Sequence, residues 1–272
     1  MNENNDIIIK AIVTGALGAM GRLFIRRIVE SPDAELYGAA ERHDHPMVGK
    51  DVGIEIFGRT IDVSLENDLR NCVVGANVVI DFTLPDATLS HVKTCAELKI
   101  PYVCGTTGMT KSQFEIFQEH AQKMPCVWAP NFSLGVTLLT QLAERAASTL
   151  GDDFDLEIVE THHRRKVDSP SGTALALAKA AATDGKLTDA DVEFGRKGQC
   201  GPRQKGQIGI HAVRGGDIIG RHEMHFFGDG EQITLTHQAY SRDAFVRGAM
   251  RAAAWLQGRE PGLYTMKDVL WM

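Results

Sequence analysis

The sequence has 272 residues, of which 43% are hydrophobic and 24% are charged, and 29 Lys and Arg against 35 Asp and Glu give a formal net charge of −6. This apolar content can bury a core in one large domain or two modest ones, which excludes a disordered chain. No run reaches the roughly 18 apolar residues of a membrane span, and the first six residues lack the charge and apolar core of a signal peptide, so we expect a cytoplasmic protein.

The first half of the chain alternates short apolar runs with helical patterns. A nearly continuous apolar run, Ile7–Val13, predicts a buried parallel strand, and Gly21–Glu30 follows it with helical spacing. Further strands are predicted at 35–40, 77–82, 101–104 and 125–128, with helices at 85–98 and 113–123. This alternation with short connections predicts a doubly wound parallel sheet.

The pattern changes after about Asn131. A helix over 136–150 leads into Phe154–Glu160, whose alternation of period two predicts a half-exposed strand. Helices are predicted at 173–182 and 243–256, and strands at 208–213, 218–227 and 232–239. These elements predict a second α+β domain with a mainly antiparallel, mixed sheet, spanning 133–242.

A glycine-rich loop joins the first predicted strand to the first helix. It comprises Gly15, Ala16, Leu17, Gly18, Ala19 and Met20, and it is followed by Gly21. Small residues in this position let backbone amides approach a pyrophosphate, and the positive end of the helix favours the anion. The preceding strand and the acidic residue about twenty positions further on make this a dinucleotide-binding pattern of the Rossmann type rather than a simple tight turn.

Glu41 and Arg42 follow the second predicted strand. A carboxylate there accepts hydrogen bonds from the ribose hydroxyls of NAD, whereas a guanidinium can pair with the extra phosphate of NADP. Their joint presence suggests that NADH and NADPH are both used, unless the two residues form only an exposed ion pair.

Three more segments end predicted strands at the same edge of the sheet, where open α/β sheets bind ligands. Asp81-Phe82-Thr83 ends one strand, and Gly105, Thr106 and Thr107 follow the next and could contact the nicotinamide and its ribose. Ala129, Pro130, Asn131 and Phe132 follow the last. We expect these segments to converge on one site.

A concentrated basic run stands apart in this acidic chain. His162-His163-Arg164-Arg165-Lys166 is followed by Ser171-Gly172-Thr173 at a predicted helix start. The amides of Gly172 and Thr173, with the Thr173 hydroxyl, can bind one carboxylate, and Lys166 can bind another. Because histidine titrates near neutrality, one of the two histidines is the natural proton donor.

Other interpretations of the basic run remain open. Adjacent histidines on an extended segment point to opposite faces and lack an obvious third ligand, so no metal site is predicted. The acidic net charge and the absence of interleaved aromatic residues disfavour a nucleic-acid patch. A solvated basic face is the remaining alternative to a site for a small dicarboxylate.

The motifs together resemble the 4-hydroxy-tetrahydrodipicolinate reductase family, also called dihydrodipicolinate reductase. The resemblance covers nearly the whole chain through VTGALGAMGR, AAER, DFTLP, GTTG, APNFSLGV, ETHHRRKVDSPSGTAL and VRGGDIIG. It implies reduction of 4-hydroxy-tetrahydrodipicolinate by NADH or NADPH, with loss of water, in lysine and diaminopimelate biosynthesis, by a homotetramer associated through the second domain. The resemblance further implies that the last helix returns to the first domain, so that 1–132 and 243–272 form the dinucleotide-binding domain. No membrane or nucleic-acid partner is implied.

The resemblance also implies roles for single residues. His162 is the general acid/base, Lys166 a second proton donor or polarising group, and His163, Gly172 and Thr173 contact the carboxylate end of the substrate. The cofactor is implied to bind through Gly15 to Met20, Glu41, Arg42, Gly105 to Thr107 and Ala129 to Phe132. Many members have Arg where this chain has Ala19, which leaves Arg42 as the main candidate for discriminating between the cofactors.

Two other functions remain as alternatives. One is a dehydrogenase of another small dicarboxylate or of a semialdehyde, although a semialdehyde dehydrogenase needs a cysteine nucleophile and no cysteine adjoins the histidine pair in sequence. The other is a cofactor-sensing protein without catalysis, which would tolerate loss of His162 and Lys166.

Overall fold

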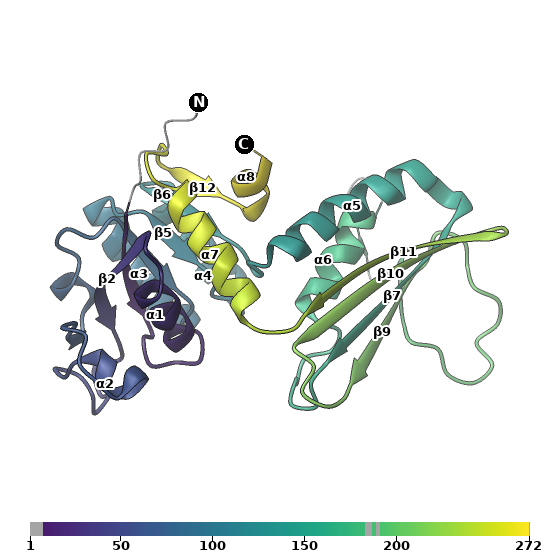
Figure 1. Ribbon diagram of the computed structural model, residues 1–272. Helices are drawn as coiled ribbons and strands as arrows, with labels where there is room; N and C mark the ends of the chain where they lie inside the picture. The colour runs from purple at the N-terminus through teal and green to yellow at the C-terminus, as the bar shows by residue number, and fades with distance from the viewer. Residues whose placement is uncertain (1–7, 183–186, 189–190, 272) are drawn as a thin grey trace. The chain divides into compact units, whose positions relative to one another are not determined.

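The chain divides into two compact units, Met1–Phe132 with Phe245–Met272 and Ser133–Ala244. The structure is a computed structural model, and it describes residues 8–182, 187–188 and 191–271 (Figure 1). The expected start of the first strand at Ile7, and the six residues before it, lie outside the described residues. Among the described residues, no helix is long and apolar enough to cross a membrane.

The first unit is built on a seven-stranded sheet in the order β12-β6-β5-β4-β1-β2-β3, in which every pairing is parallel. This order from β3 to β6 is that of dinucleotide-binding sheets, extended by one strand, so the predicted Rossmann-type sheet is confirmed. The strands are β1 (Ile9–Thr14), β2 (Ala34–Ala40), β3 (Leu65–Glu66), β4 (Val78–Asp81), β5 (Tyr102–Cys104), β6 (Pro125–Trp128) and β12 (Gly262–Tyr264).

Local sequence signals set the helices of this unit. Pro85 occupies the first turn of its helix, where its missing N–H costs nothing. Thr110 and Gln113 form a capping box at the start of another. The helices are α1 (Gly21–Val29), α2 (Val52–Phe57), α3 (Pro85–Leu98), α4 (Lys111–Ala121), α7 (Asp243–Trp255) and α8 (Met266–Trp271), with a 3₁₀ turn at Leu69–Asn71.

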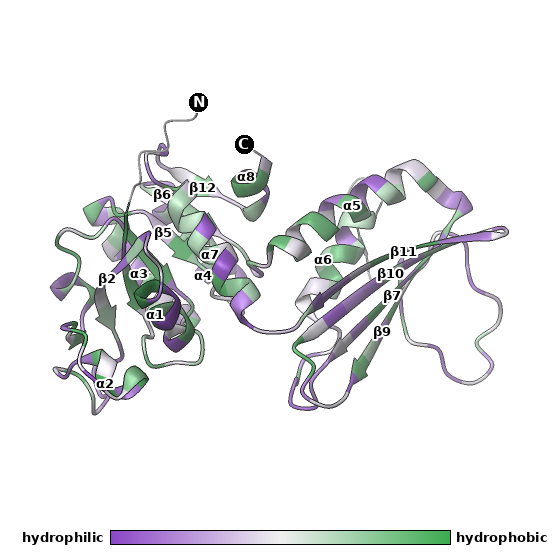
Figure 2. Ribbon diagram, viewed as in Figure 1, coloured by the Kyte–Doolittle hydropathy of each residue, from purple (hydrophilic) through white to green (hydrophobic). Residues whose placement is uncertain are grey.

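The second unit has a five-stranded sheet in the order β11-β10-β7-β9-β8. Its pairings are antiparallel from β11 to β7 and parallel from β7 to β8, so the predicted mixed sheet is confirmed. The strands are β7 (Asp155–His162), β8 (Val192–Phe194), β9 (Ile208–Arg214), β10 (Gly220–Gly228) and β11 (Glu231–Ala239). Figure 2 shows that the hairpin end joining β10 to β11 is hydrophilic.

Two helices, α5 (Leu134–Leu150) and α6 (Gly172–Ala181), pack on one face of this sheet. The core between them contains Leu139, Leu177, Ile158, Ile210 and Phe226. Each helix begins at a serine whose hydroxyl accepts a hydrogen bond from the backbone three residues later, Ser133 for α5 and Ser171 for α6. These two caps fix where the helices start over the sheet.

The structure also contains short elements that the sequence patterns do not predict: α2, β3, β8, β12 and α8. Each has only two to six residues. A hydrophobic periodicity cannot be recognised over so few positions. Contacts with the rest of the fold decide the conformation of these short elements instead.

Candidate active site

The first unit brings the predicted cofactor segments to one edge of its sheet. β1, β2, β4, β5 and β6 are parallel, and the predicted segments follow their carboxyl ends at residues 15–20, 41–42, 81–83, 105–107 and 129–132. This edge is where ligands bind in open parallel sheets. The structure therefore gathers all the predicted cofactor residues at this edge. That they bind a cofactor remains a prediction.

The glycine loop has the tight geometry that a dinucleotide requires. Gly15 has a φ of 59°, and a Cβ there would lie 2.8 Å from Cγ2 of Thr83. A Cβ on Gly21 would lie 2.1 Å from the carbonyl oxygen of Gly15. Only glycine fits these positions, and the loop offers a cradle in which backbone approaches a ligand closely.

Backbone contacts narrow the part of the loop that could meet a pyrophosphate. The amide of Ala16 donates to the carbonyl of Ala40 at 3.1 Å, and that of Gly18 donates to Gly15 at 2.9 Å. The amide of Leu17 donates to the Glu41 carboxylate at 3.1 Å. These three amides are engaged within the fold, which leaves the part of the loop beyond Gly18, where it leads into α1, as the part that could face an anion.

Glu41 and Arg42 have different surroundings. Glu41 also accepts the amide of Arg42 at 3.1 Å, so two backbone donors hold its carboxylate between the glycine loop and the end of β2. The Arg42 side chain is 69% exposed, and its Nε lies 3.3 Å from Asp44. Glu41 is thus fixed beside the loop, while Arg42 is an exposed cation in a surface ion pair.

The 105–107 segment rests on aromatic side chains. A Cβ on Gly105 would lie 2.2 Å from the Phe82 ring, whose centroid is 4.8 Å from that of Phe24 and 5.3 Å from that of Phe132. Phe132 and Thr106 are each 1% exposed. These two residues therefore shape the edge from beneath, and the exposed Thr107 is the one whose side chain faces solvent.

A buried polar network lies below this edge and is absent from the sequence prediction. The Asp81 carboxylate is fully buried, with His91 Nδ1 at 2.7 Å and the Tyr102 hydroxyl at 2.5 Å. Burial alone would raise the pKa of Asp81, but the contacts with His91 and Thr83 outweigh it and lower that pKa. The network fixes Thr83 against Gly15.

In the second unit, His162 is the last residue of β7 and is 9% exposed. Its Nδ1 lies 2.5 Å from Oε2 of Glu160, which is fully buried two residues earlier on the same face. The Glu160 carboxylate has a lowered pKa and is ionised, so the ring nitrogen is the donor. His162 therefore keeps Nε2 for proton exchange.

Glu160 is paired with an arginine that the sequence prediction overlooks. Arg214, at the end of β9, donates from its two terminal nitrogens to the two Glu160 oxygens, each at 2.8 Å. Burial would raise the pKa of Glu160, and the bonds from Arg214 and His162 outweigh that effect. Burial lowers the pKa of His162, against the opposing influence of Glu160. The free imidazole is thus mainly neutral at pH 7.

A second buried histidine lies against the first. The His222 ring on β10 is 5.1 Å from the His162 ring, edge to face, and its Nε2 is 3.1 Å from the Ser171 hydroxyl. Burial and the neighbouring His162 lower the pKa of His222 to about 4. His222 is therefore neutral at pH 7 and connects His162 to the cap of α6.

The predicted carboxylate site at the start of α6 is adjacent to this cluster. Ser171 caps the helix, and its backbone amide donates to Oε1 of Glu160 at 3.0 Å. Gly172 is exposed, and no atom lies within 4 Å of where its Cβ would be. The helix start therefore has open space on the side of Gly172, as an anion site requires.

Lys166 and His163 lie on the loop that joins β7 to α6. The Lys166 ammonium donates to both oxygens of Asp168 at 2.7 Å, a partner that the sequence prediction does not name. Nδ1 of His163 is buried without a hydrogen-bond partner. Lys166 is thus a cation held by an exposed carboxylate, and a substrate carboxylate would have to replace Asp168.

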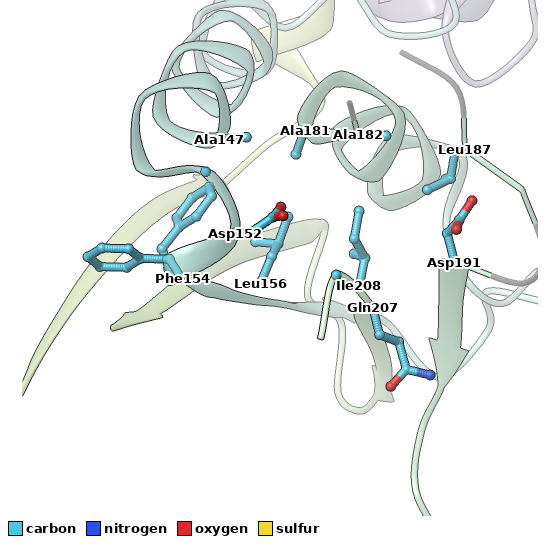
Figure 3. Close-up of a pocket in the computed structure, with 13 residues that line it drawn as sticks. Ala147, Asp152, Phe154, Leu156, Ala181, Ala182, Leu187, Asp191, Gln207 and Ile208 are labelled. Carbon is cyan, nitrogen blue, oxygen red and sulfur yellow. The ribbon is translucent and has the colours of Figure 1, made fainter. Parts of the chain in front are cut away.

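A separate cavity of about 180 Å³ lies at the other end of α6 (Figure 3). It is lined by the last residues of the helix, Ala181 and Ala182, and by apolar strand residues including Leu156 and Ile208. Because α6 spans ten residues at about 1.5 Å each, this cavity is distant from the His162 cluster.

Among the described residues, no group of three or more His, Cys, Asp or Glu could hold a metal ion.

One sequence signal could have identified Glu160. β7 alternates strictly, with Leu156, Ile158, Glu160 and His162 on the buried face. A carboxylate at a core-facing position two residues before the candidate acid/base must have a partner there. Arg214 and His222 lie far from Glu160 in the sequence, on the two strands that neighbour β7 in the sheet. Only the pairing of these strands brings them close to Glu160.

Comparison with known proteins places both units in one family. The model of dihydrodipicolinate reductase, N-terminus, matches residues 9–132, and that of dihydrodipicolinate reductase, C-terminus, matches 135–270. A 4-hydroxy-tetrahydrodipicolinate reductase of Syntrophus aciditrophicus is 45% identical over 97% of this chain and 98% of the relative. One of a Ruegeria species is 46% identical over 95% and 97%.

Solved structures agree with this assignment. A dipicolinate-bound dihydrodipicolinate reductase from Paenisporosarcina matches with a TM-score of 0.76 and 28% identity, over 97% of this chain and 100% of that chain. An amine dehydrogenase from Mycobacterium smegmatis matches with a TM-score of 0.60 and 13% identity, over 95% of each chain, which shows a shared fold alone.

Proposed function

The chain belongs to the dihydrodipicolinate reductase family, and we propose that it reduces 4-hydroxy-tetrahydrodipicolinate to tetrahydrodipicolinate with loss of water. It is an oxidoreductase that uses a nicotinamide cofactor, and its reaction belongs to lysine and diaminopimelate biosynthesis. The observation that carries the proposal is the cluster of His162, Glu160 and Arg214 beside the start of α6, within a chain that matches this family over nearly its full length.

The second unit supplies the groups that bind a small dicarboxylate. One carboxylate is bound by the backbone at Gly172 and Thr173, where the positive end of α6 favours an anion. His163 contributes to this end, and Lys166 binds the other carboxylate as a point charge after exchanging Asp168 for substrate. These contacts neutralise the dianion and hold the ring in one orientation. This lowers the entropic cost of reaching the transition state.

His162 manages the proton. Loss of the substrate's hydroxyl as water leaves a conjugated imine. Its reduction gives an electron-rich enamine that takes a proton, and Nε2 of His162 donates it. The buried carboxylate of Glu160 stabilises the imidazolium that forms beforehand. The binding of a dianion nearby favours the protonated ring, which offsets the low pKa that burial gives it in the free protein. Lys166 also polarises the substrate.

The first unit holds the cofactor, whose reduced nicotinamide supplies the hydride when bound. The start of α1 beyond Gly18 binds the pyrophosphate, and Glu41 binds the ribose hydroxyls next to it. Arg42 pairs with the extra phosphate of NADPH. Thr107 and the 129–132 segment contact the nicotinamide half. Gly15 and Gly21 keep the loop in its tight form, because a Cβ at either position would collide with Thr83 or with the backbone of Gly15.

The alternative of a semialdehyde dehydrogenase lacks a nucleophile. Burial raises the pKa of four thiols, which are therefore poor sources of thiolate: Cys72, Cys95, Cys104 and Cys126. All four belong to the first unit, and the exposed Cys200 lies on the loop between β8 and β9. None is part of the His162 cluster, which supports reduction of an imine over oxidation through a thioester.

Turnover of the proposed substrate tests this function. The purified chain is mixed with reduced nicotinamide and the enzymatically generated precursor, and the loss of nicotinamide absorbance is followed. We expect oxidation that depends on both the precursor and the protein. Absence of turnover with NADH and with NADPH would refute the proposal.

Arg42→Ala tests the choice of cofactor. Because Arg42 is exposed and paired only with the surface carboxylate of Asp44, its removal leaves the fold intact. We expect the KM for NADPH to rise by about tenfold, the loss of one charged contact, with the KM for NADH changed less than about twofold. Asp44→Asn is the matched control, and equal effects of Arg42→Ala on both cofactors would contradict dual use.

Asp168→Asn tests the role of Lys166. The substitution removes the carboxylate that the substrate must displace from the ammonium. We expect the KM for substrate to fall by about two- to fivefold, the range of one exposed ion pair, with kcat little changed. A steady-state titration of substrate measures this, and an increased KM would show that Asp168 orients Lys166 instead.

We further propose that the chain forms a homotetramer through the sheet of the second unit. The face of this sheet turned away from α5 and α6 carries Val213 and Phe227, which are 47% and 41% exposed. Exposed apolar residues on a sheet face are typical of an association surface. Sedimentation equilibrium measures the mass, and replacing Phe227 with Asp is expected to lower it.

A further inference from the structure

Glu160 occupies an unusual place on β7. Its neighbours on the same face, Leu156 and Ile158, belong to the hydrophobic core, yet Glu160 is fully buried and ionised. Burying an ionised carboxylate is costly unless every lone pair is satisfied. Its retention in this position points to a role other than stability.

Both oxygens of this carboxylate are used twice. Oε2 accepts from Nδ1 of His162 at 2.5 Å and from Arg214 at 2.8 Å. Oε1 accepts from the backbone amide of Ser171 at 3.0 Å and from Arg214 at 2.8 Å. One rigid group therefore fixes both the imidazole and the residue that caps α6.

We propose that Glu160 is a positioning residue for the reaction, which aligns the proton-donating ring of His162 with the carboxylate-binding start of α6, and that Arg214 holds it in place. This inference rests on the proposed function. Because the two oxygens reach the ring and the helix start at once, a shift of the carboxylate would misalign the proton donor relative to the bound substrate. Glu160 itself touches neither substrate nor cofactor.

The charges facing His162 give this role a measurable signature. Lys166 on the following loop and Arg214 on β9 disfavour the imidazolium, as does burial, whereas His222 on β10 is neutral at pH 7. Glu160 is the carboxylate bonded to the ring, and it favours the imidazolium. Removing its charge lowers the pKa of His162 further, so an activity that needs the protonated ring is lost at lower pH.

The test compares Glu160→Gln with Glu157→Gln, which removes the other arginine-bonded glutamate of β7, on the opposite face. For Glu160→Gln we expect kcat to fall about 10- to 100-fold, part of what an acid/base histidine supplies, and the alkaline limb of kcat/KM to move to lower pH. Cofactor Kd should be unchanged. Glu157→Gln should leave the limb in place. An unmoved limb in Glu160→Gln would overturn the proposal.

A measurement on the unsubstituted protein covers the case in which Glu160→Gln fails to fold. In ¹⁵N-histidine spectra at neutral pH, we expect the His162 signal, identified by its loss in His162→Gln, to report a proton on Nδ1. A ring protonated on Nε2 would contradict the role of Glu160. This result is independent of turnover, so a protein with the expected tautomer but no reductase activity would refute the proposed function and leave the alignment standing.

Discussion

The two faces of β7 carry two clusters of the same residue types, each a glutamate bonded to arginine and histidine. On the inner face, Glu160 binds Arg214 and His162, and on the outer face Glu157 binds Arg196, Arg203 and His211. The Glu160 side chain is fully buried, while that of Glu157 is 14% exposed. Residue types alone therefore do not distinguish a reactive cluster from a structural one.

The difference lies in what each cluster adjoins. The inner cluster touches Ser171 at the start of α6, a helix end that can bind an anion. The outer cluster ties the loop between β8 and β9 to the strand through Arg196 and Arg203, and the absent side chain of Gly209 makes room for Glu157. We infer that the inner cluster serves the reaction and the outer one fastens a loop.

The largest difference between the clusters is expected in turnover. His162→Gln should lower kcat by about 10²- to 10⁴-fold, the contribution of an acid/base group, with cofactor affinity unchanged. His211→Gln, the matched change on the outer face, should alter kcat less than about twofold, since surface pairs contribute little. Steady-state rates and cofactor titrations measure both. Comparable losses in the two variants would remove the distinction.

Stability should also separate the two faces. Arg214→Gln leaves the buried Glu160 without its bidentate partner and should lower the free energy of unfolding by about 3 kcal/mol. Arg196→Gln removes a partner from the more exposed Glu157, which Arg203 still binds, and should cost about 1 kcal/mol. Urea unfolding provides the measurement, and a larger loss for Arg196→Gln would reverse the assignment.

The smallest expected difference is in how stability depends on pH. His222 has a pKa of about 4 in the folded chain, below the ordinary 6.5, so stability present above pH 6.5 is lost as the pH falls toward about 4. The lost free energy is at most about 3 kcal/mol. Glu157 has a pKa of about 2 against an ordinary 4.5, so its contribution is lost only between about pH 4.5 and 2.

Two variants separate these windows in urea unfolding at stepped pH. His222→Asn should flatten the loss between pH 6.5 and 4 and leave the lower window intact. Glu157→Gln should flatten the lower window alone. If His222→Asn leaves the upper window unchanged, the neutral state of the buried ring does not control it.

Sequence patterns predicted the parallel and mixed types of the two sheets and most of the longer elements, because the hydrophobic periods of long elements extend over many residues. The glycine loop and the helix start near Ser171-Gly172-Thr173 were also predicted, since turn and helix-start chemistry is local. The contacts of Arg214 with Glu160 and of His222 with His162 were not predicted, because Arg214 and His222 lie 54 and 62 positions beyond Glu160 in the chain and approach only through strand pairing. The pairing of Lys166 with Asp168 was overlooked although the two are close in sequence.

The cofactor edge illustrates the same limit. Gly15 and Gly21 were predicted to let the backbone approach a phosphate. The structure shows why both are glycine: Thr83 packs against Gly15, and the carbonyl of Gly15 packs against Gly21. The network of Asp81, His91 and Tyr102 beneath that edge joins the side chains of two strands and a helix, and their contacts depend on how β4, α3 and β5 pack together. Side-chain networks between elements cannot be inferred from local patterns.

Transfer of deuterium tests the central claim most directly. The chain is supplied with reduced nicotinamide deuterated at its hydride position and with enzymatically generated 4-hydroxy-tetrahydrodipicolinate, and the product is analysed by mass spectrometry. We predict tetrahydrodipicolinate with one cofactor-derived deuterium in its ring, and almost none formed by His162→Gln. A product without deuterium, or equal yields from the two proteins, would contradict the account.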